Sequence, residues 1–310
     1  MRVLALLNAE AGSGPVASLG TLDKSVSQAF AAHGVVATVR LVRGTEMSEA
    51  LAAAAGAPGF DALVVGGGDE SVRSAAEALA GSTVPLGVLP LGTLNHFAKD
   101  LGLPLAPADA ICAIAAGVVR AVDVGELNGR IFVNNSSVGL YPFMVEQRAI
   151  GQRRGLSKFH ATIPAIVRTV RGASWHRLSV VAQGSRKRIR TPVLFVGNNL
   201  YDVGLRSLGN RRCLDKGELG VFVVKRQTWL GLLLLVAKVV FDRTDPRRDM
   251  ERFRCSEVEI ASHAKRLLVS LDGEVVRLQP PLRYRSRPGA LKVLVPAGEP
   301  RAEPEGSERT

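Results

Sequence analysis

Cysteine is scarce in this chain. Its three copies, Cys112, Cys213 and Cys255, lie far apart, and none of them belongs to a CxxC pair. A disulfide framework needs an even set of cysteines and a zinc site needs closely spaced ones, so the sequence argues against both. The scarcity fits a protein of the reducing cytoplasm.

Long hydrophobic runs are also missing. The most apolar stretch, residues 229–241, is 13 residues long and contains Lys238, whereas a membrane-spanning helix needs about 20 apolar residues. The chain begins with an apolar run that is too short for a secretory signal. We therefore expect no secretion signal and no membrane span, and we interpret residues 229–241 as a buried or interfacial helix.

Acidic residues are absent between Gln147 and Tyr201, where the sequence has eleven lysines and arginines, including the run RKRIR at 186–190. This segment supplies nearly the whole net charge of +12. Zinc-finger and aromatic RNA-binding motifs are absent as well, so we expect no nucleic-acid partner. The basic segment predicts contact with an anionic membrane surface or a phosphorylated ligand, and a solvated basic face is the alternative.

The order of the predicted elements indicates an α/β fold in residues 1–125. Predicted strands at 3–8, 35–42, 62–66, 86–90 and 120–125 alternate with predicted helices at 16–33, 46–55, 71–79, 93–102 and 107–116. This alternation over short loops predicts a doubly wound, Rossmann-like domain whose parallel sheet is covered on both faces. In such a sheet, ligands bind at the carboxyl ends of the strands.

Residues 126–298 have a different sequence pattern, in which short strand candidates predominate. Short strand candidates occur at 129–140, 177–184, 191–199, 219–224, 257–262, 266–278 and 290–295, separated by turn residues. They predict a second, β-rich domain of the β-sandwich type, interrupted by helices near 155–172 and 228–241. Residues 299–310 are polar and predict a disordered tail.

A glycine-rich turn follows the predicted strand at 62–66. Gly66, Gly67 and Gly68 allow successive backbone N–H groups to point at an anion beside a helix N-terminus, which favours phosphate. Asp69 would repel a bare phosphate, so its presence indicates a metal ion or a hydroxyl group that loses its proton. A tight turn with Asp69 as a helix N-cap is the alternative.

Two similar turns follow other strands of the predicted sheet, NAEAGSG at 8–14 and PLGTLNH at 90–96. Three polar, glycine-containing turns at one edge of a parallel sheet predict a nucleotide site. The chain contains no GxxxxGK(S/T) motif, which argues against a P-loop. The first turn does not read GxGxxG, which argues against an NAD site.

In this order the three turns resemble the diacylglycerol kinase catalytic-domain family of soluble bacterial lipid kinases, which is related to sphingosine kinases and NAD kinases. The family's turns read NPxxG, GGDGT and PxGTxND, and this chain has NAEAGSG, GGDES and PLGTLNH. The motifs RAVDVG, VNNSSVGLYPFMVEQR, GNNLYDVG, LDKGELGV and LDGE follow in the family's order. The resemblance therefore covers about residues 1–296.

The resemblance implies an ATP- and Mg²⁺-dependent enzyme of phospholipid biosynthesis, which transfers the γ-phosphoryl group to a lipid hydroxyl in a cleft between two domains. The resemblance does not decide whether the acceptor is a diacylglycerol-like lipid or a sphingoid base. It also does not decide whether the protein is a monomer or a homodimer. The soluble bacterial branch implies a cytoplasmic enzyme that associates peripherally with the inner membrane face. A catalytically weak or inactive homologue that binds lipid or nucleotide for regulation is the alternative.

The family's roles transfer to the matching residues of this chain. Asp272, in LDGE, matches the proposed general base of the soluble bacterial enzymes, while Asp69 matches the base of sphingosine and NAD kinases. We predict that Asp272 is the base and that Asp69 orients metal and phosphates; a simple Asp-Gly hairpin turn is the alternative at 272. The predicted nucleotide-binding residues are Asn8, Gly12, Gly67, Gly68, Asp69, Ser71, Gly92, Thr93, Asn95 and Glu274.

Two departures from the family pattern concern charge. Glu70 replaces the glycine after the aspartate of GGDGT and adds a negative charge beside the nucleotide phosphates, where glycine would permit a positive φ or a close approach. In the second domain, the family's DDG-like metal site reads Asp215-Lys216-Gly217. Asp215 and Glu218 are left there as the predicted ligands of a structural metal.

Overall fold

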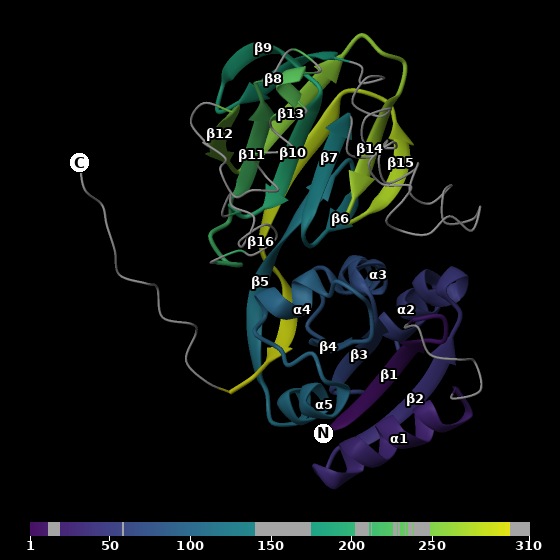
Figure 1. Cartoon of the computed structure of the whole chain (residues 1–310). Helices are drawn as coiled ribbons and strands as arrows, with labels where there is room; N and C mark the ends of the chain where they lie inside the picture. The colour runs from purple at the N-terminus through teal and green to yellow at the C-terminus, as the bar shows by residue number, and fades with distance from the viewer. Residues whose placement is uncertain are drawn as a thin grey trace.

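The computed structural model describes residues 1–11, 19–57, 59–139, 175–201, 211, 213–225, 228, 230–232, 234, 238 and 249–297. Within these ranges the chain forms an α/β part and a β-rich part, which two long strands connect (Figure 1). This arrangement confirms the fold class expected from the sequence.

Parallel strands form the sheet of the first part. They are β1 (Arg2–Asn8), β2 (Val36–Val42), β3 (Ala62–Gly67) and β4 (Leu86–Pro90), in the order β2-β1-β3-β4. The helical elements are α1 (Leu19–Ala32), the short 3₁₀ helix η2 (Gly44–Glu46), α2 (Met47–Ala55), α3 (Asp69–Leu79), α4 (His96–Asp100) and α5 (Pro107–Ala115). Strands and helices alternate along the chain, as the sequence predicts.

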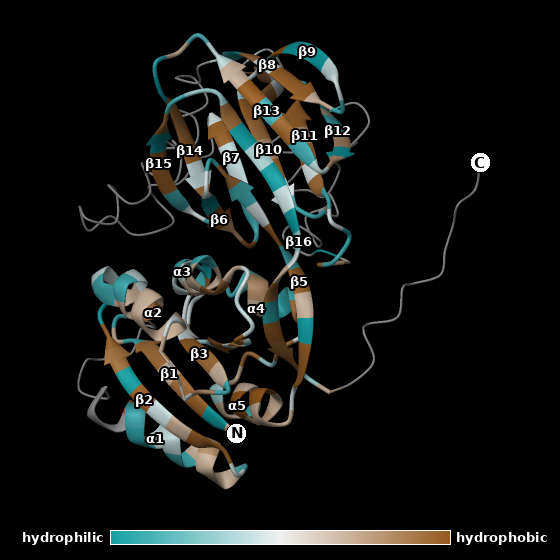
Figure 2. Ribbon diagram, turned by 180° about the vertical axis from the view of Figure 1, so that it is seen from behind, coloured by the Kyte–Doolittle hydropathy of each residue, from teal (hydrophilic) through white to brown (hydrophobic). Residues whose placement is uncertain are grey.

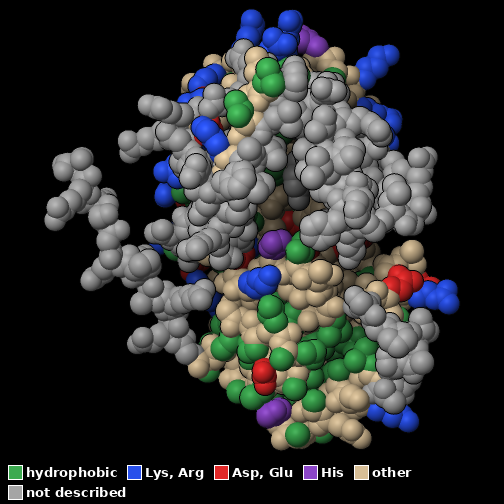
Figure 3. Space-filling view, in the orientation of Figure 1, with side chains coloured by type: hydrophobic (Ala, Val, Ile, Leu, Met, Phe, Trp, Pro, Cys, Tyr) green, Lys and Arg blue, Asp and Glu red, His purple; other side chains and the backbone are tan. Residues whose placement is uncertain are grey.

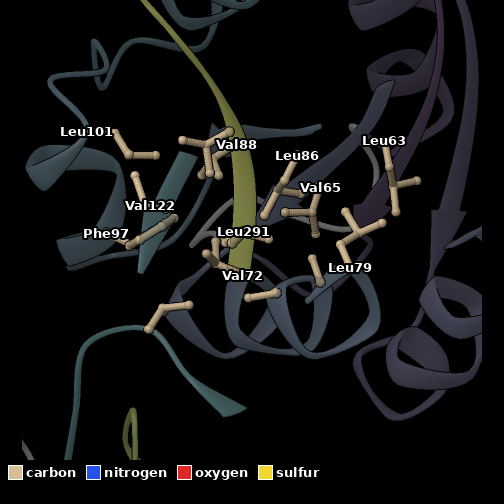
Figure 4. Close-up of a cluster of buried hydrophobic side chains, with 14 of the residues drawn as sticks. Leu63, Val65, Val72, Leu79, Leu86, Val88, Phe97, Leu101, Val122 and Leu291 are labelled. Carbon is tan, nitrogen blue, oxygen red and sulfur yellow. The ribbon is translucent and has the colours of Figure 1, made fainter. Parts of the chain in front are cut away.

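Helices cover both faces of this parallel sheet. Leu7 of β1 belongs to a buried cluster with Phe30 of α1 and Ile114 of α5. Leu6, on the opposite face because side chains alternate along a strand, belongs to a second cluster with Leu79 of α3. Figure 4 shows Leu79 with other members of this cluster. Burial on both faces explains why β1, β3 and β4 are continuous hydrophobic runs, and Figure 2 shows β1 largely in brown, whereas the edge strand β2 is partly exposed and less uniformly hydrophobic.

The helix predicted at 93–102 is shorter in the structure, where α4 begins at His96. Asn95 has a left-handed backbone conformation with φ 51° and ψ 46°, which a right-handed helix cannot include. Its amide side chain hydrogen-bonds to Gly92 and holds the preceding residues as a loop. The polar turn after β4 is therefore a separate structure at the edge of the sheet.

Two paired strands connect the parts. β16 (Leu282–Val295) pairs with β4 through Val293 and, at its other end, with β13 (Glu257–Ser262) of the second part. β5 (Val118–Leu127) runs antiparallel to β16. The domain boundary predicted at 125 falls inside β5, because the connection is a hydrogen-bonded ladder and its residues have the same strand pattern on both sides of that point.

The second part is a β-sandwich. Its further strands are β6 (Arg130–Phe132), β7 (Asn135–Gly139), β8 (His176–Ala182), β9 (Ser185–Thr191), β10 (Val193–Asn198), β11 (Leu219–Val224), β12 (Met250–Cys255), β14 (Leu267–Leu271) and β15 (Glu274–Leu278). A six-stranded sheet has the order β12-β11-β10-β7-β14-β15. The other strands belong to a ten-stranded sheet that continues the parallel sheet of the first part, in the order β2-β1-β3-β4-β16-β13-β8-β9, with β5 paired to β16 and β6 paired to β5. Val138 and Val221 of the six-stranded sheet pack with Val180 and Tyr284 of the ten-stranded sheet.

The second part has two strands that the sequence did not predict, and its predicted helices and tail are described only in part or not at all. The predicted helix at 155–172 and the tail at 299–310 lie outside the described residues, while residues 230–232, 234 and 238 are helical as expected. Strands β9 and β12 were not predicted, because their polar sequences lack a hydrophobic alternation. Among the described residues, no helix is long and apolar enough to cross a membrane.

Candidate active site

The turns after β1 and β3 contact each other. The side-chain amide of Asn8 donates a hydrogen bond to the Ser71 hydroxyl at 3.3 Å. A Cβ atom on Gly67 would lie 2.5 Å from the same hydroxyl oxygen, so this contact requires glycine. Two of the three predicted turns are thus held together by residues that the sequence predicts to bind nucleotide, and Gly12 of the first turn lies outside the described residues.

The turn after β4 packs against the glycine-rich turn. A Cβ atom on Gly92 would lie 2.5 Å from the Cα atom of Gly68. Asn95 closes this turn, since its side chain accepts the Gly92 N–H at 3.1 Å and donates to the Gly92 carbonyl at 2.8 Å. Thr93 is exposed beside it. The backbones of the two turns are therefore in close contact at the edge of the sheet where the parallel strands end.

Asp69 is the first residue of α3, and Gly68 is the N-cap, so the predicted alternative of Asp69 as the cap is not what forms. One Asp69 carboxylate oxygen instead accepts the backbone N–H of Phe97 in α4 at 3.4 Å. Gly68 has no side chain that could satisfy the first N–H groups of α3. These groups stay available to an anion.

Glu70 lies in the first turn of α3, with its side chain exposed. The helical backbone at this position does not need the positive φ that glycine would permit. An acidic side chain in the first turn also interacts favourably with the helix dipole. The Glu70 departure from the family pattern therefore concerns charge and not backbone conformation.

Asp272 is both a turn residue and a half-buried hydrogen-bond acceptor. Asp272 and Gly273 have φ values of 47° and 94° and join β14 to β15, as in the predicted Asp-Gly hairpin turn. The Asp272 carboxylate also accepts three backbone N–H groups, from Val133 at 2.7 Å, Asn134 at 2.8 Å and Asn135 at 2.9 Å. The two interpretations of this residue describe different parts of it, since the backbone makes the turn and the side chain points inward.

Burial raises the pKa of the Asp272 carboxyl group to about 6, although the three N–H donors and the nearby Arg211 guanidinium lower it. A carboxyl group with a pKa this close to neutrality can accept a proton in the physiological range. The electrostatics therefore suit the general base that the sequence predicts at this position.

An ion pair joins the Asp272 hairpin to the glycine-rich turn. Glu274 of β15 pairs with Arg73 of α3, which also pairs with Glu77 at 2.9 Å. Arg73 is four residues after Asp69, so the two side chains lie on the same face of α3. The contact brings the loop of Asp272, from the second part, to the helix that begins with Asp69.

A buried arginine, which the sequence does not single out, links α4 to the second part. The Arg211 Nε donates a hydrogen bond to Asp100, the last residue of α4, at 2.8 Å. Its Nη2 lies 2.7 Å from the same carboxylate oxygen in an ion pair, and both side chains are at most 1% exposed. Its guanidinium also donates to the Val133 carbonyl at 2.5 Å and to the Asn134 side chain at 3.0 Å. Arg211 thus supports the segment that binds Asp272.

The residues of the predicted structural metal site do not fit a metal. Asp215 forms an ion pair with Arg120 at 2.8 Å, and Glu218 lies 3.4 Å from Arg254. The described part of the chain contains no group of three or more histidine, cysteine or acidic side chains that could hold an ion. The carboxylates at this turn are neutralised by arginines.

A buried aspartate orders the same turn. Asp123, which is 2% exposed, accepts the N–H groups of Gly217 at 2.6 Å and Gly289 at 2.9 Å, and the Asn199 amide at 3.2 Å. This residue belongs to the motif RAVDVG, from which the sequence predicted no role for it. An aspartate between the two apolar residues Val122 and Val124 was the available signal, because a buried charge needs partners.

Two family models match the chain. The diacylglycerol kinase catalytic domain matches residues 2–127, and the YegS C-terminal NAD kinase beta sandwich-like domain matches residues 144–295. Together the matches cover the predicted turns and the Asp272 hairpin.

Curated relatives match most of the length of the chain. A probable lipid kinase YegS-like protein of Pseudomonas fluorescens Pf-5 is 30% identical over 293 residues, which cover 89% of this chain and 91% of the relative. A protein of the same description from Pseudomonas aeruginosa PAO1 is 31% identical over 271 residues, 82% of this chain and 81% of the relative.

Solved structures have the same fold. The crystal structure of a diacylglycerol kinase from Bacillus anthracis superposes with a TM-score of 0.66 at 19% identity, covering 96% of this chain and 97% of the other. A second chain from that organism superposes with a TM-score of 0.74 at 22% identity and the same coverage.

Proposed function

The chain belongs to the YegS-like lipid kinases with a diacylglycerol kinase catalytic domain, and from this premise we propose that it transfers the γ-phosphoryl group of ATP to a lipid hydroxyl. The observation that carries the proposal is the contact between Glu274 and Arg73, which brings the Asp272 hairpin to the helix of Asp69. In this proposal, Asp272 as the base and the glycine-rich turn as the phosphate-binding edge act together where the two parts meet.

The three turns would hold the nucleotide. Backbone N–H groups at the start of α3 and the closely packed Gly68 and Gly92 offer donors without side chains in the way. Asp69 is the carboxylate best placed for Mg²⁺, which is typically bound by one or two carboxylates together with substrate phosphates. When bound, this ion would neutralise part of the charge on the phosphates.

Asp272 would accept the proton of the lipid hydroxyl. The hydroxyl oxygen forms a bond to the γ-phosphorus, the bond between this phosphorus and the ADP oxygen breaks, and ADP leaves. The three N–H donors fix the carboxylate, and its pKa of about 6 keeps it mostly ionised near pH 7.

Two unpartnered hydroxyl groups could receive the polar end of the acceptor. Ser137 of β7 and Ser270 of β14 are register partners, both at most 1% exposed, and neither side-chain oxygen has a hydrogen-bond partner among the residues that the structure describes. Ser270 is two residues before Asp272. A buried hydroxyl without a partner costs about 1–3 kcal/mol, which a bound lipid oxygen would recover.

The test is transfer of radiolabel from γ-labelled ATP to a panel of diacylglycerol, monoacylglycerol and sphingoid base in mixed micelles. We expect label in one lipid class with the wild type and a loss of at least about 100-fold with Asp272→Asn. ATP binding by calorimetry without transfer to any lipid would instead indicate a binding-only relative. A cytoplasmic enzyme that visits the inner membrane face is part of the same proposal, because its acceptor lies in the bilayer.

A further inference from the structure

The basic run at 186–190 has no role in the proposed reaction. It forms most of β9, which lies at one end of the ten-stranded sheet and pairs with β8. Because side chains alternate along a strand, Arg186, Arg188 and Arg190 share one face and Lys187 and Ile189 the other. Ile189 packs against the core of the second part, so the three arginines face outward.

β8 adds a fourth arginine to this outward face. Arg177 is the register partner of Arg190, and all four arginines are exposed. Figure 3 shows lysines and arginines gathered at the upper end of the second part, where Figure 1 places β8 and β9. Like charges directly opposite each other weaken a strand pair, so this arrangement is costly unless something neutralises it.

Other basic residues of the same strands and sheet face have acidic partners. Lys187, on the inner side of β9, pairs with Glu251 of β12. Arg283 and Arg285 of β16, further along the outward face, pair with glutamates of β13 and β5. Within the ranges that the structure describes, the four outward arginines of β8 and β9 have no such ion pair. We refer to Arg177, Arg186, Arg188 and Arg190 as the arginine face.

The arginine face forms an open groove of about 760 Å³ together with His263. The described residues that line it include no carboxylate and, apart from the histidine ring, no aromatic side chain. Charge on an edge strand also discourages pairing with other chains. That role, however, does not require a fourth arginine on the inner neighbour β8 or the gathering of charge on one face.

We propose that the arginine face docks the protein on an anionic lipid bilayer. An open, flat groove with several cationic side chains matches a surface that carries many anionic head groups, and each near-surface arginine contributes about fivefold to membrane partitioning. The lack of stacking aromatics speaks against single-stranded nucleic acid. The choice of a bilayer rests on the proposed function, which requires access to a membrane lipid.

The test is binding of the full chain, without nucleotide, to vesicles of phosphatidylcholine mixed with phosphatidylglycerol and to vesicles of phosphatidylcholine alone. We expect binding to the anionic vesicles only, and an affinity about 25-fold lower for Arg188→Gln/Arg190→Gln. The matched control is Arg283→Gln/Arg285→Gln, which removes the same charge from the same sheet face where acidic partners balance it. We expect a loss of less than about threefold in that control.

Three outcomes would overturn the proposal. If Arg188→Gln/Arg190→Gln binds vesicles as well as the wild type does, the arginines of β9 serve only to discourage pairing of the sheet edge with other chains. If both double variants lose affinity equally, binding depends on net charge and not on a docking face. A loss of double-stranded DNA binding without a loss of vesicle binding would point to nucleic acid instead. Arg188→Lys/Arg190→Lys keeps the charge and should retain binding, which separates electrostatics from misfolding.

Activity on a water-soluble, short-chain diacylglycerol separates this inference from the proposed function. Arg188→Gln/Arg190→Gln should phosphorylate this lipid at the wild-type rate, because the arginine face lies away from the reacting groups. If the wild type itself transfers no phosphate but its vesicle binding depends on the arginine face, the proposed function fails and the docking surface stands.

Discussion

Asp272 and Arg211 both hold the segment 133–135, each through hydrogen bonds of its side chain. The Asp272 carboxylate accepts the three N–H groups of this segment, while the Arg211 guanidinium donates to the Val133 carbonyl and to the Asn134 side chain. Arg211 is in turn fixed by Asp100 at the end of α4. The position of the proposed base thus depends on a buried ion pair that reaches back to the nucleotide side of the site.

The raised pKa of Asp272 predicts how activity changes with pH. A general base works only when ionised, so the active fraction falls as pH drops through the pKa of about 6. We expect kcat/KM to fall about tenfold per pH unit below about pH 6 and to be level above about pH 7. A pH–rate profile on short-chain diacylglycerol measures this, and a level profile through about pH 5 would contradict the role of Asp272.

Removing one partner of the buried Arg211–Asp100 pair should destabilise the protein strongly. We expect Arg211→Met to lower the free energy of unfolding by about 3–5 kcal/mol, because Asp100 is left as an uncompensated buried charge. The double variant Arg211→Met/Asp100→Leu should recover part of this loss in urea titrations. Its activity should stay low, since the segment 133–135 still lacks the hydrogen bonds from Arg211. A double variant with wild-type activity would show that the pair contributes to stability alone.

The sequence was sufficient for features that depend on local pattern. The hydrophobic runs at 62–66 and 86–90 are buried strands of a parallel sheet, and the polar turns that follow them meet at one edge. This meeting follows from topology alone, since parallel strands align their carboxyl ends. The Asp-Gly pair at 272 predicted a hairpin from backbone preference, and its positive φ values confirm that part.

Features that depend on distant partners could not be predicted. Arg211 and Asp100 are 111 residues apart, and in sequence Arg211 is one of many arginines in a basic protein. Its burial depends on how α4 meets the second part, which no periodicity encodes. The metal ligands predicted at Asp215 and Glu218 are a second example. Their spacing in the sequence suggested a metal site, but in the structure each carboxylate pairs with an arginine that is distant in the sequence.

The ion pair between Glu274 and Arg73 should matter for catalysis more than for stability. Glu274→Gln removes the contact between the Asp272 hairpin and α3, while Arg73 keeps Glu77 as a partner. We expect kcat/KM to fall by about tenfold, equivalent to 1.4 kcal/mol of transition-state stabilisation, with a stability change below about 1 kcal/mol. The matched control Glu77→Gln breaks the other ion pair of Arg73 and should stay within about twofold of wild-type activity. Equal losses in both variants would show that Arg73 itself, and not the interdomain contact, is what matters.

Glu70 offers the sharpest test of the nucleotide site. Because its side chain is exposed in the first turn of α3, it acts on bound phosphates as a solvent-screened charge, which is worth about 1 kcal/mol at 4 Å in water. Glu70→Gln and Glu70→Gly should therefore tighten Mg·ATP binding by a similar factor of about five in calorimetry. The glycine variant should also lose about 1 kcal/mol of stability, because glycine is a poor helix former and the favourable interaction with the helix dipole disappears.

The comparison of these two variants separates charge from shape. If the side chain itself blocked the phosphates, Glu70→Gln would bind no better than the wild type and only Glu70→Gly would gain affinity, by far more than fivefold. The helical conformation at this position argues against that outcome, since the side chain leaves the backbone N–H groups of the turn open. Tight wild-type binding with a small, equal gain in both variants would show that the glycine of the family pattern can be replaced without losing the nucleotide site.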